Sequence, residues 1–236
     1  MNDYDAERIE PRVPSIDKRI ATFKELSNRI GKDRVVWRFD PLILTDTLTV
    51  NDLLLKIERI GDQMAEYTSR LVFSFIDIAS YKKVAVNLGR GSFRAREFTH
   101  DEMCEMAEGI GRLIKRWGIA SGTCGEIEDL ERFGIEHNRC IDDRLIAKLF
   151  NSDAELMKFI GAEYDMLDGW SIGKSKKDNG QRKACGCIMS KDIGEYNTCP
   201  HLCHYCYANT SDSVAMTNWE RHRSCPEAET ITGRTC

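Results

Sequence analysis

Long apolar runs are missing from this 236-residue sequence. No stretch approaches the roughly 18 consecutive apolar residues that a membrane span needs, and the charged N-terminal residues lack the apolar core of a signal or transit peptide. Neither sign of charge dominates, because 34 Lys and Arg balance 38 Asp and Glu to a net charge of -4. Bulk charge therefore indicates no nucleic acid or other polyanionic partner, and we expect a cytoplasmic protein without a membrane association.

The sequence also lacks the short fingerprints of several large enzyme classes. It contains no nucleophile elbow, Walker motif or dinucleotide-binding motif, and no internal repeat. Its ten cysteines fall below the density of roughly 8–10% that marks disulfide-stapled secreted proteins. They are clustered instead: none precedes Cys104, and half of them lie between Cys185 and Cys206. In a reducing compartment, such clustered thiols are metal ligands more often than disulfides.

What the sequence does contain is an alternation of helical and extended patterns. Apolar residues at helical spacing predict helices over residues 16–30, 51–67 and 99–117. Short apolar or alternating segments predict strands over residues 35–40, 71–77 and 119–124. This order indicates an α/β fold with a parallel sheet. Because these strands fall short of the eight in a closed barrel, we expect an incomplete parallel sheet, similar to part of a TIM barrel, with helices.

The same patterns divide the chain into four parts. We expect a partial α/β barrel-like domain over residues 1–150, because the helix and strand patterns weaken beyond that point. A helical or linker segment follows over residues 151–183. A cysteine-rich cluster-binding segment, which we expect to hold iron and sulfide, covers residues 184–211, and a C-terminal tail covers residues 212–236.

Three cysteines in the third of these parts stand in a distinctive pattern. Cys199, Cys203 and Cys206 form C-x3-C-x2-C, with Tyr205 and Tyr207 on either side of the last cysteine. A tight loop of this kind can hold a 4Fe-4S cluster by three thiolates and leave one iron without a protein ligand. The pattern resembles the radical S-adenosylmethionine (radical SAM) signature.

The radical SAM resemblance implies a cofactor set and a chemistry. The open iron would chelate S-adenosylmethionine close to the two tyrosines, which are the expected cofactor-binding residues. Electron transfer from the cluster would then cleave the sulfonium and yield a 5'-deoxyadenosyl radical. A flavodoxin-like or ferredoxin-like protein would be the electron donor.

The same residue types also allow a zinc site or a second cluster. His201, His204 and the same thiols could form a tetrahedral zinc site, although the cysteines and histidines here exceed what one zinc ion needs. Four further cysteines could hold a second cluster or a zinc ion, namely Cys124, Cys140, Cys185 and Cys187. The alternative for Cys124 and Cys140 is that they are small buried apolar side chains.

Several segments of the chain together resemble one protein family. They are IEPRVPS (9–15), VVWRFDP (35–41), SFID (74–77), TCGE (123–126) and the block from NGQRK to CYAN (179–209). The chain resembles, over nearly its full length, a family of uncharacterised bacterial and archaeal proteins classed as a domain of unknown function. The resemblance implies an iron-sulfur protein with a partial α/β barrel and with no established substrate.

The resemblance also shows a departure at the N-terminus. Members of that family begin with a further segment that contains an Arg-Arg-Thr-Asp motif and a Trp-Thr-Lys-Asn-Pro motif, and neither occurs here. We therefore expect that strands of the sheet are missing and that its edge is unpaired. Such a chain would be oligomeric or poorly soluble.

Polar residues follow each predicted strand, where parallel α/β folds place their ligands. Arg38 and Asp40 end the first strand, Ser74 and Asp77 lie on the second, and Glu126 follows the third. We expect Arg38 to bind a carboxylate of cofactor or substrate, and Asp40, Asp77 and Glu126 to bind hydroxyl or amino groups. The alternative is an internal Arg-Asp pair that ties the strand ends together.

These observations lead to three functional hypotheses. The first is a 4Fe-4S protein of radical SAM type that acts on an unknown substrate. The second is a non-catalytic zinc or cluster protein with a structural, redox-sensing or partner-binding role. The third is a nucleic-acid repair enzyme similar to spore photoproduct lyase, suggested by the C-terminal C-x3-C-x2-C-Y context, which the acidic net charge does not support.

Overall fold

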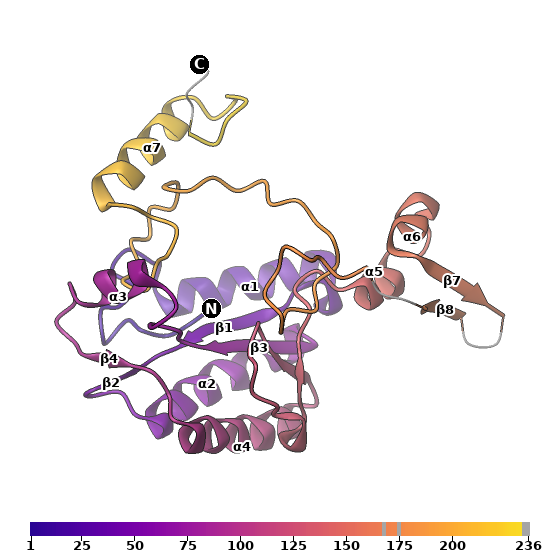
Figure 1. The fold of residues 1–236 in the computed structure, drawn as a ribbon, viewed down its shortest axis with the longest axis horizontal. Helices are drawn as coiled ribbons and strands as arrows, with labels where there is room; N and C mark the ends of the chain where they lie inside the picture. The colour runs from indigo at the N-terminus through magenta and orange to yellow at the C-terminus, as the bar shows by residue number, and fades with distance from the viewer. Residues whose placement is uncertain (167–168, 174–175, 233–236) are drawn as a thin grey trace.

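A sheet of four parallel strands forms the centre of the protein in the computed structural model, which describes residues 1–166, 169–173 and 176–232 (Figure 1). The strand order is β1-β3-β5-β6. The strands are β1 (Trp37–Leu42), β3 (Arg70–Phe75), β5 (Ala120–Thr123) and β6 (Ile135–His137). The α/β class and the parallel sheet are thus confirmed. Within the described residues, however, the sheet does not close into a barrel.

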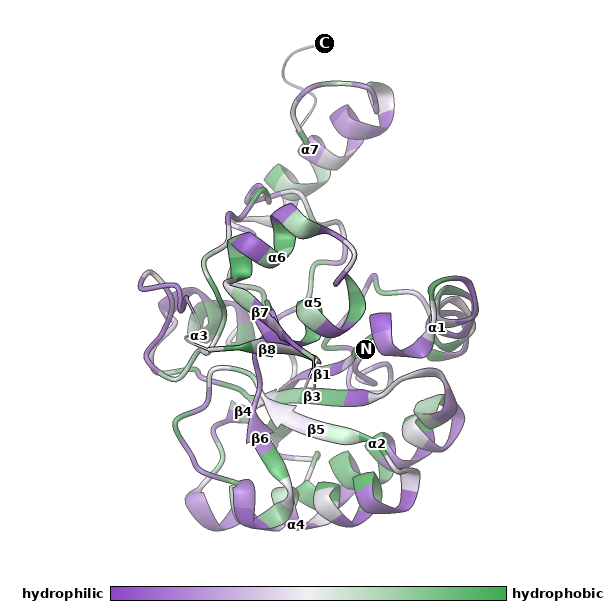
Figure 2. Ribbon diagram, turned by 90° about the vertical axis from the view of Figure 1, so that its right-hand side faces the viewer, coloured by the Kyte–Doolittle hydropathy of each residue, from purple (hydrophilic) through white to green (hydrophobic). Residues whose placement is uncertain are grey.

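Three amphipathic helices match the predicted ones. They are α1 (Ile16–Ile30), α2 (Val50–Met64, continued by the 3-10 turn η2, Ala65–Tyr67) and α4 (His100–Trp117). Thr49 and Asp52 form a capping box at the start of α2, and Thr99 and Glu102 form another at the start of α4. Figure 2 shows hydrophilic and hydrophobic segments alternating along these helices, as expected for helices with one buried face.

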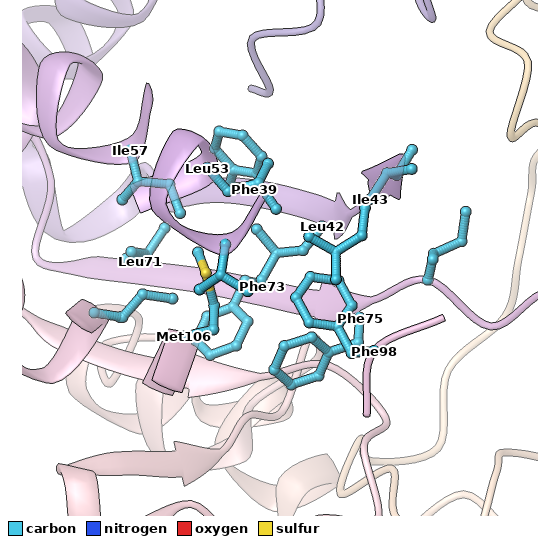
Figure 3. Close-up of a cluster of buried hydrophobic side chains, with 14 of the residues drawn as sticks. Phe39, Leu42, Ile43, Leu53, Ile57, Leu71, Phe73, Phe75, Phe98 and Met106 are labelled. Atoms are coloured by element: carbon cyan, nitrogen blue, oxygen red, sulfur yellow. The ribbon is translucent and has the colours of Figure 1, made fainter. Parts of the chain in front are cut away.

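The hydrophobic core lies between the sheet and the helices. Leu53 and Ile57 of α2 and Met106 of α4 are fully buried, and they meet Phe39 and Phe73 of the central strands (Figure 3). Alternation along β1 and nearly complete burial of β3 supply the strand side of this core. This packing fixes the carboxyl ends of the central strands relative to the helices.

Two details of the sheet differ from the sequence predictions. The strand β6 was not predicted, because it has only three residues and only Ile135 of them is buried. The predicted stop at Pro41 was also wrong, since β1 continues to Leu42 with an irregular register between Phe39 and Leu42. Proline is tolerated there because β1 is an edge strand with a local irregularity.

The outer edge of β1 is covered by the N-terminal residues. The Asn2 side chain accepts a hydrogen bond from the Asp40 amide at 2.7 Å and donates one to the Asp40 carbonyl at 3.1 Å. The Tyr4 hydroxyl donates to the Pro41 carbonyl at 2.8 Å and accepts from the Ile43 amide at 3.0 Å. These bonds pair backbone groups of Asp40, Pro41 and Ile43 at this edge.

A small appendage follows the sheet and extends to one side of the molecule (Figure 1). It consists of α5 (Asp143–Leu149), α6 (Ala154–Ile160) and the hairpin of β7 (Ala162–Asp165) and β8 (Gly169–Ile172). Its own core contains the buried residues Ala147, Met157, Ile160 and Ile188. The sequence predicted only a helical or linker segment over residues 151–183, so the hairpin is an addition, and α5 lies within the range predicted for the barrel-like domain.

The remaining elements are short or peripheral. They are η1 (Lys32–Arg34), β2 (Leu44–Thr45), α3 (Lys82–Leu88), β4 (Ala95–Arg96), η3 (Glu131–Phe133) and α7 (Asp212–Ser224). The cysteine-rich segment, orange in Figure 1, has irregular backbone and arches over the sheet. Among the described helices, none has the length and apolar character required to cross a bilayer.

The cysteines differ in state along the chain. The eight from Cys104 to Cys206 have free thiols, whereas Cys225, after α7, is disulfide-bonded. Cys236, to which the sequence analysis assigns no role, lies outside the described residues.

Candidate functional site

A cavity of about 510 Å³ lies at the carboxyl ends of β1, β3 and β5. One wall consists of residues at the strand ends, and the other belongs to the cysteine-rich segment. The polar and cysteine residues that line it include Asp40, Ser74, Asp77, Glu126, Cys203, Tyr205, Cys206 and Tyr207. The structure thus brings two groups of predicted site residues, far apart in the sequence, into one cavity, which we call the strand-end cavity.

The second wall is part of a closed loop, residues 197–210, which we call the three-cysteine loop. The Asn209 side chain donates a hydrogen bond to the Cys199 carbonyl at 2.9 Å, and its backbone amide points at the Cys206 sulfur at 3.4 Å. The Cys206 amide donates to the Cys203 carbonyl at 3.0 Å. Asn197 joins the two ends of the loop, since its side-chain oxygen accepts from the Thr210 amide.

The three-cysteine loop is attached to the body of the protein by polar contacts. The Asn87 side chain of α3 donates to the Cys206 carbonyl at 2.8 Å, and the His204 amide donates to the Ile9 carbonyl at 3.0 Å. The Tyr205 hydroxyl donates to the Glu10 carboxylate and accepts from the Asn2 side chain. The hydroxyl of Tyr205 is therefore used in anchoring, while the residue itself still lines the cavity.

Burial dominates the electrostatics of this loop. It raises the pKa of the Cys203 thiol to about 12, and the nearby Glu10 carboxylate adds to the effect. The pKa of Tyr205 is raised well above its usual range by burial and by the same carboxylate. The thiol and the phenol are therefore neutral at pH 7 when the loop holds no cation.

The residues on the strand-end wall have different partners. Arg38 forms an ion pair with Asp40, which also accepts a hydrogen bond from the Ser74 hydroxyl. This ion pair is the alternative that the sequence left open for Arg38. Arg38 is not one of the described residues that line the strand-end cavity. Asp77 accepts from the Ser80 amide at 3.0 Å. Both Asp40 and Asp77 line the cavity, but the two carboxylate oxygens of Asp40 are already engaged by Arg38 and Ser74.

Glu126 is the most perturbed carboxylate of the cavity. Burial raises its pKa to about 7, although the Phe75 amide donates a hydrogen bond to it at 2.9 Å. Next to it, the Arg182 guanidinium packs against Gly125, where an added Cβ would lie 2.7 Å from the nearest guanidinium nitrogen. Gly125 also has a positive φ of 69°, so this close approach depends on glycine.

Four further cysteines, Cys124, Cys140, Cys185 and Cys187, lie on segments that contact one another. The Cys124 and Cys140 sulfurs are 3.4 Å apart. The amides of Cys140 and Ile141 donate to the Cys187 sulfur at 3.1 and 3.4 Å. Burial raises the pKa of the Cys187 thiol, and the neighbouring Cys185 thiol adds to this rise. We call this group the four-thiol site.

The described side chains of the two cysteine groups are not arranged as a metal site. In the part of the chain that the structure describes, no group of three or more His, Cys, Asp or Glu side chains already has the arrangement of a metal site. The two histidines of the zinc alternative point to different surroundings: the His204 ring contacts Phe93 edge-on at 5.6 Å, and His201 lies in a smaller pocket with Arg38.

The residues that hold the loop in place carry no local sequence pattern. Three of them, Asn2, Glu10 and Asn209, are buried in loops, and the half-buried Asn87 lies in the short helix α3, so no periodicity marks them. Arg182 lies in a polar segment that was assigned to the linker. The available signal was the family resemblance, because Glu10, Arg182 and Asn209 lie in segments that carry it.

Comparison with known proteins gives one match. A family model described as "Domain of unknown function (DUF1848)" matches residues 1–208. The matched range includes the residues named above that line the strand-end cavity and both groups of cysteines. No curated protein and no solved structure matches the chain.

Proposed function

The chain belongs to the family described as domain of unknown function DUF1848, and on that premise we propose that it is an iron-sulfur protein of the radical SAM type. Cys199, Cys203 and Cys206 would hold a 4Fe-4S cluster, and S-adenosylmethionine would bind in the strand-end cavity. The observation that carries this proposal is that Cys203 and Cys206 line the same cavity as the carboxyl ends of the strands.

The construction of the three-cysteine loop supports the cluster. Three thiols stand on one short loop whose ends are joined through Asn197 and Asn209, and the Asn209 amide already donates to the Cys206 sulfur. Amide-to-sulfur hydrogen bonds of this kind tune and stabilise iron-sulfur clusters. A cluster held by three thiolates keeps one iron open, as binding of a small-molecule ligand requires.

The strand-end cavity fits S-adenosylmethionine in size and in chemistry. Its volume of about 510 Å³ lies in the range of roughly 300–1,000 Å³ that is usual for small-molecule sites. Asp77 and Glu126 can accept hydrogen bonds from ribose hydroxyls or the amino group, and carboxylates favour a cationic sulfonium. Arg182 can pair with the carboxylate of the ligand.

Aromatic and apolar residues complete the cavity. The Tyr81 and Tyr207 rings both line it with centroids 6.3 Å apart, and such rings can pack against an adenine base. Phe75, Ile76 and Val84 form an apolar part of the wall, which would exclude water from a reactive site. When bound, the cluster would supply the electron that cleaves S-adenosylmethionine to a 5'-deoxyadenosyl radical, which would then act on a substrate.

The proposal includes a partner and a compartment. The electron must come from outside the chain, so we propose a flavodoxin-like or ferredoxin-like donor. A reducing cytoplasm would keep the thiols of the three-cysteine loop free for metal.

Anaerobic reconstitution tests the proposal. The full chain is loaded with iron and sulfide, reduced with dithionite and incubated with S-adenosylmethionine, and 5'-deoxyadenosine is measured by mass spectrometry. We expect 5'-deoxyadenosine from the wild type and from Cys104→Ser, a matched control outside both cysteine groups. We expect none from Cys203→Ser.

Electron paramagnetic resonance adds a binding readout that does not depend on turnover. We expect the spectrum of the reduced cluster to change when S-adenosylmethionine is added. A fully loaded wild-type protein that forms no 5'-deoxyadenosine and shows no spectral change would overturn the proposal. Zinc in place of iron at these three cysteines would favour the non-catalytic hypothesis instead.

A further inference from the structure

The four-thiol site has a chemistry of its own that the proposed function does not use. Its cysteines come from the end of β5, from the loop after β6 and from the segment that precedes the three-cysteine loop. None of these four described residues lines the strand-end cavity. We infer that Cys124, Cys140, Cys185 and Cys187 bind one structural zinc ion.

The distance between two of the sulfurs favours a single ion over a second cluster. Zinc-sulfur bonds of about 2.3 Å in a tetrahedron place neighbouring sulfurs about 3.8 Å apart, and the Cys124 and Cys140 sulfurs are 3.4 Å apart. In a 4Fe-4S cluster each thiolate binds a different iron, which holds the sulfurs further apart. The two thiols therefore already have nearly the separation that one zinc ion requires.

A backbone hydrogen bond joins the segment of Cys185 and Cys187 to the segment of Cys140. The Cys187 side chain is buried, and its sulfur accepts from the amide of Cys140 itself. Between Cys185 and Cys187, Gly186 allows the chain to pack against Arg139, because an added Cβ would lie 2.9 Å from the Arg139 Cγ. The Cys187 sulfur thus lies against the Cys140 backbone, and the C-x-C spacing places Cys185 two residues away from it.

The surroundings supply the charge balance that such a site needs. Four thiolates around Zn²⁺ carry a net charge of minus two, which requires hydrogen-bond donors or cations nearby. Arg38 donates from its guanidinium to the Cys140 sulfur at 3.0 Å, and two backbone amides donate to the Cys187 sulfur. These donors are aimed at sulfur and come from β1 and from the loop after β6.

The inferred zinc site is closed and therefore structural. Four cysteine ligands leave no open position for water or substrate. The ion would tie the strand ends to the start of the cysteine-rich segment, next to Arg182, whose carbonyl accepts from the Cys185 amide at 2.9 Å. It would fix the wall of the strand-end cavity that Arg182 forms.

Metal content of the full chain tests the inference. The protein is expressed with zinc, and zinc and iron are measured by plasma mass spectrometry. We expect one zinc per chain in the wild type, in Cys104→Ser and in the triple variant Cys199→Ser/Cys203→Ser/Cys206→Ser. We expect zinc to fall to near zero in Cys185→Ser/Cys187→Ser, and X-ray absorption on the triple variant to show sulfur ligands at about 2.3 Å.

Three outcomes would overturn the inference. They are a wild-type protein without zinc, a triple variant that binds iron and no zinc, and a Cys124–Cys140 disulfide in zinc-supplemented protein. The wild type and the triple variant decide the question even if Cys185→Ser/Cys187→Ser fails to fold. Zinc retention without 5'-deoxyadenosine would contradict the proposed function alone, whereas 5'-deoxyadenosine without zinc would contradict this inference alone.

Discussion

Asn209 shows how one residue can hold a site together. Its side chain is buried and bonds to the Cys199 carbonyl, while its amide points at the Cys206 sulfur. It therefore contacts the first and the last cysteine of the three-cysteine loop. Removing its side chain leaves a carbonyl in the loop without its donor and frees the start of the loop.

We expect Asn209→Ala to weaken retention of the cluster. Because residues around metal ligands contribute about 10-fold to 100-fold in metal affinity, iron should be lost to a chelator about that much faster. The measurement is iron release from anaerobically loaded protein, with the exposed Asn51→Ala as the control. Equal rates for Asn209→Ala and wild type would show that the loop does not depend on this bond.

At the scale of single elements, α4 depends on groups at its first turn. Glu102 closes the capping box with Thr99 and pairs with Arg96. The hydrogen bond from Arg96, followed by that from the Thr99 amide, lowers the pKa of Glu102 to about 2 from its usual 4.5. A carboxylate with a lowered pKa stabilises the fold above its unfolded pKa, and this contribution is lost as the pH falls.

We expect this pH dependence to disappear in Glu102→Gln. The wild type should lose part of its stability between pH 4.5 and about 2, while the variant lacks this part at every pH. The difference in free energy of unfolding between the two proteins should therefore shrink over that range. The check is urea unfolding at a series of pH values, and a difference that stays constant with pH would contradict it.

The contact between α2 and α4 gives a second prediction at this scale. An added Cβ at Gly61 would lie 2.1 Å from the Trp117 ring, and that ring also packs against Trp37 with centroids 6.0 Å apart. Gly61→Ala should destabilise the protein by about 1–3 kcal/mol through overpacking, although alanine favours an isolated helix. Chemical denaturation measures this, with Gly173→Ala as the control, because no atom of the described residues beyond its chain neighbours lies within 4 Å of the added Cβ. An unchanged or raised free energy of unfolding would show that α2 and α4 can move apart to accommodate the methyl group without loss of stability.

At the scale of the whole molecule, the two cores differ in extent. The main core includes α1, α2, α4 and the central strands, whereas the appendage buries only a few apolar side chains. Strand β3 lies between two other strands and is almost completely buried, but β7 is mostly exposed. Regions with few buried contacts open with a lower free energy than the core.

We therefore expect hydrogen exchange to separate the two parts. Amides of β7 and β8 should exchange much faster than those of β3, because the hairpin can open without disrupting the main core. Exchange measured by mass spectrometry on native protein tests this. Equal protection of hairpin and β3 would show that the appendage unfolds only together with the sheet.

Much of the fold could be predicted because its signals are local. The apolar spacing of α1, α2 and α4, and the capping boxes at Thr49 and Thr99, depend on neighbouring residues. Strand β6 and the hairpin could not be predicted, because three or four mostly exposed residues carry no clear pattern. Both depend on pairing with residues elsewhere in the chain.

The candidate site divides in the same way. The sequence alone determined the C-x3-C-x2-C spacing, the polar strand ends and the C-x-C pair, because these are properties of adjacent residues. Only the tertiary structure decided that Cys203 and Glu126 share a cavity, that Arg38 pairs with Asp40, and that Cys124 meets Cys140. The reason is that the parallel sheet brings its strand ends to one edge, and buried polar contacts such as that of Asn2 with Tyr205 then hold a distant loop over that edge.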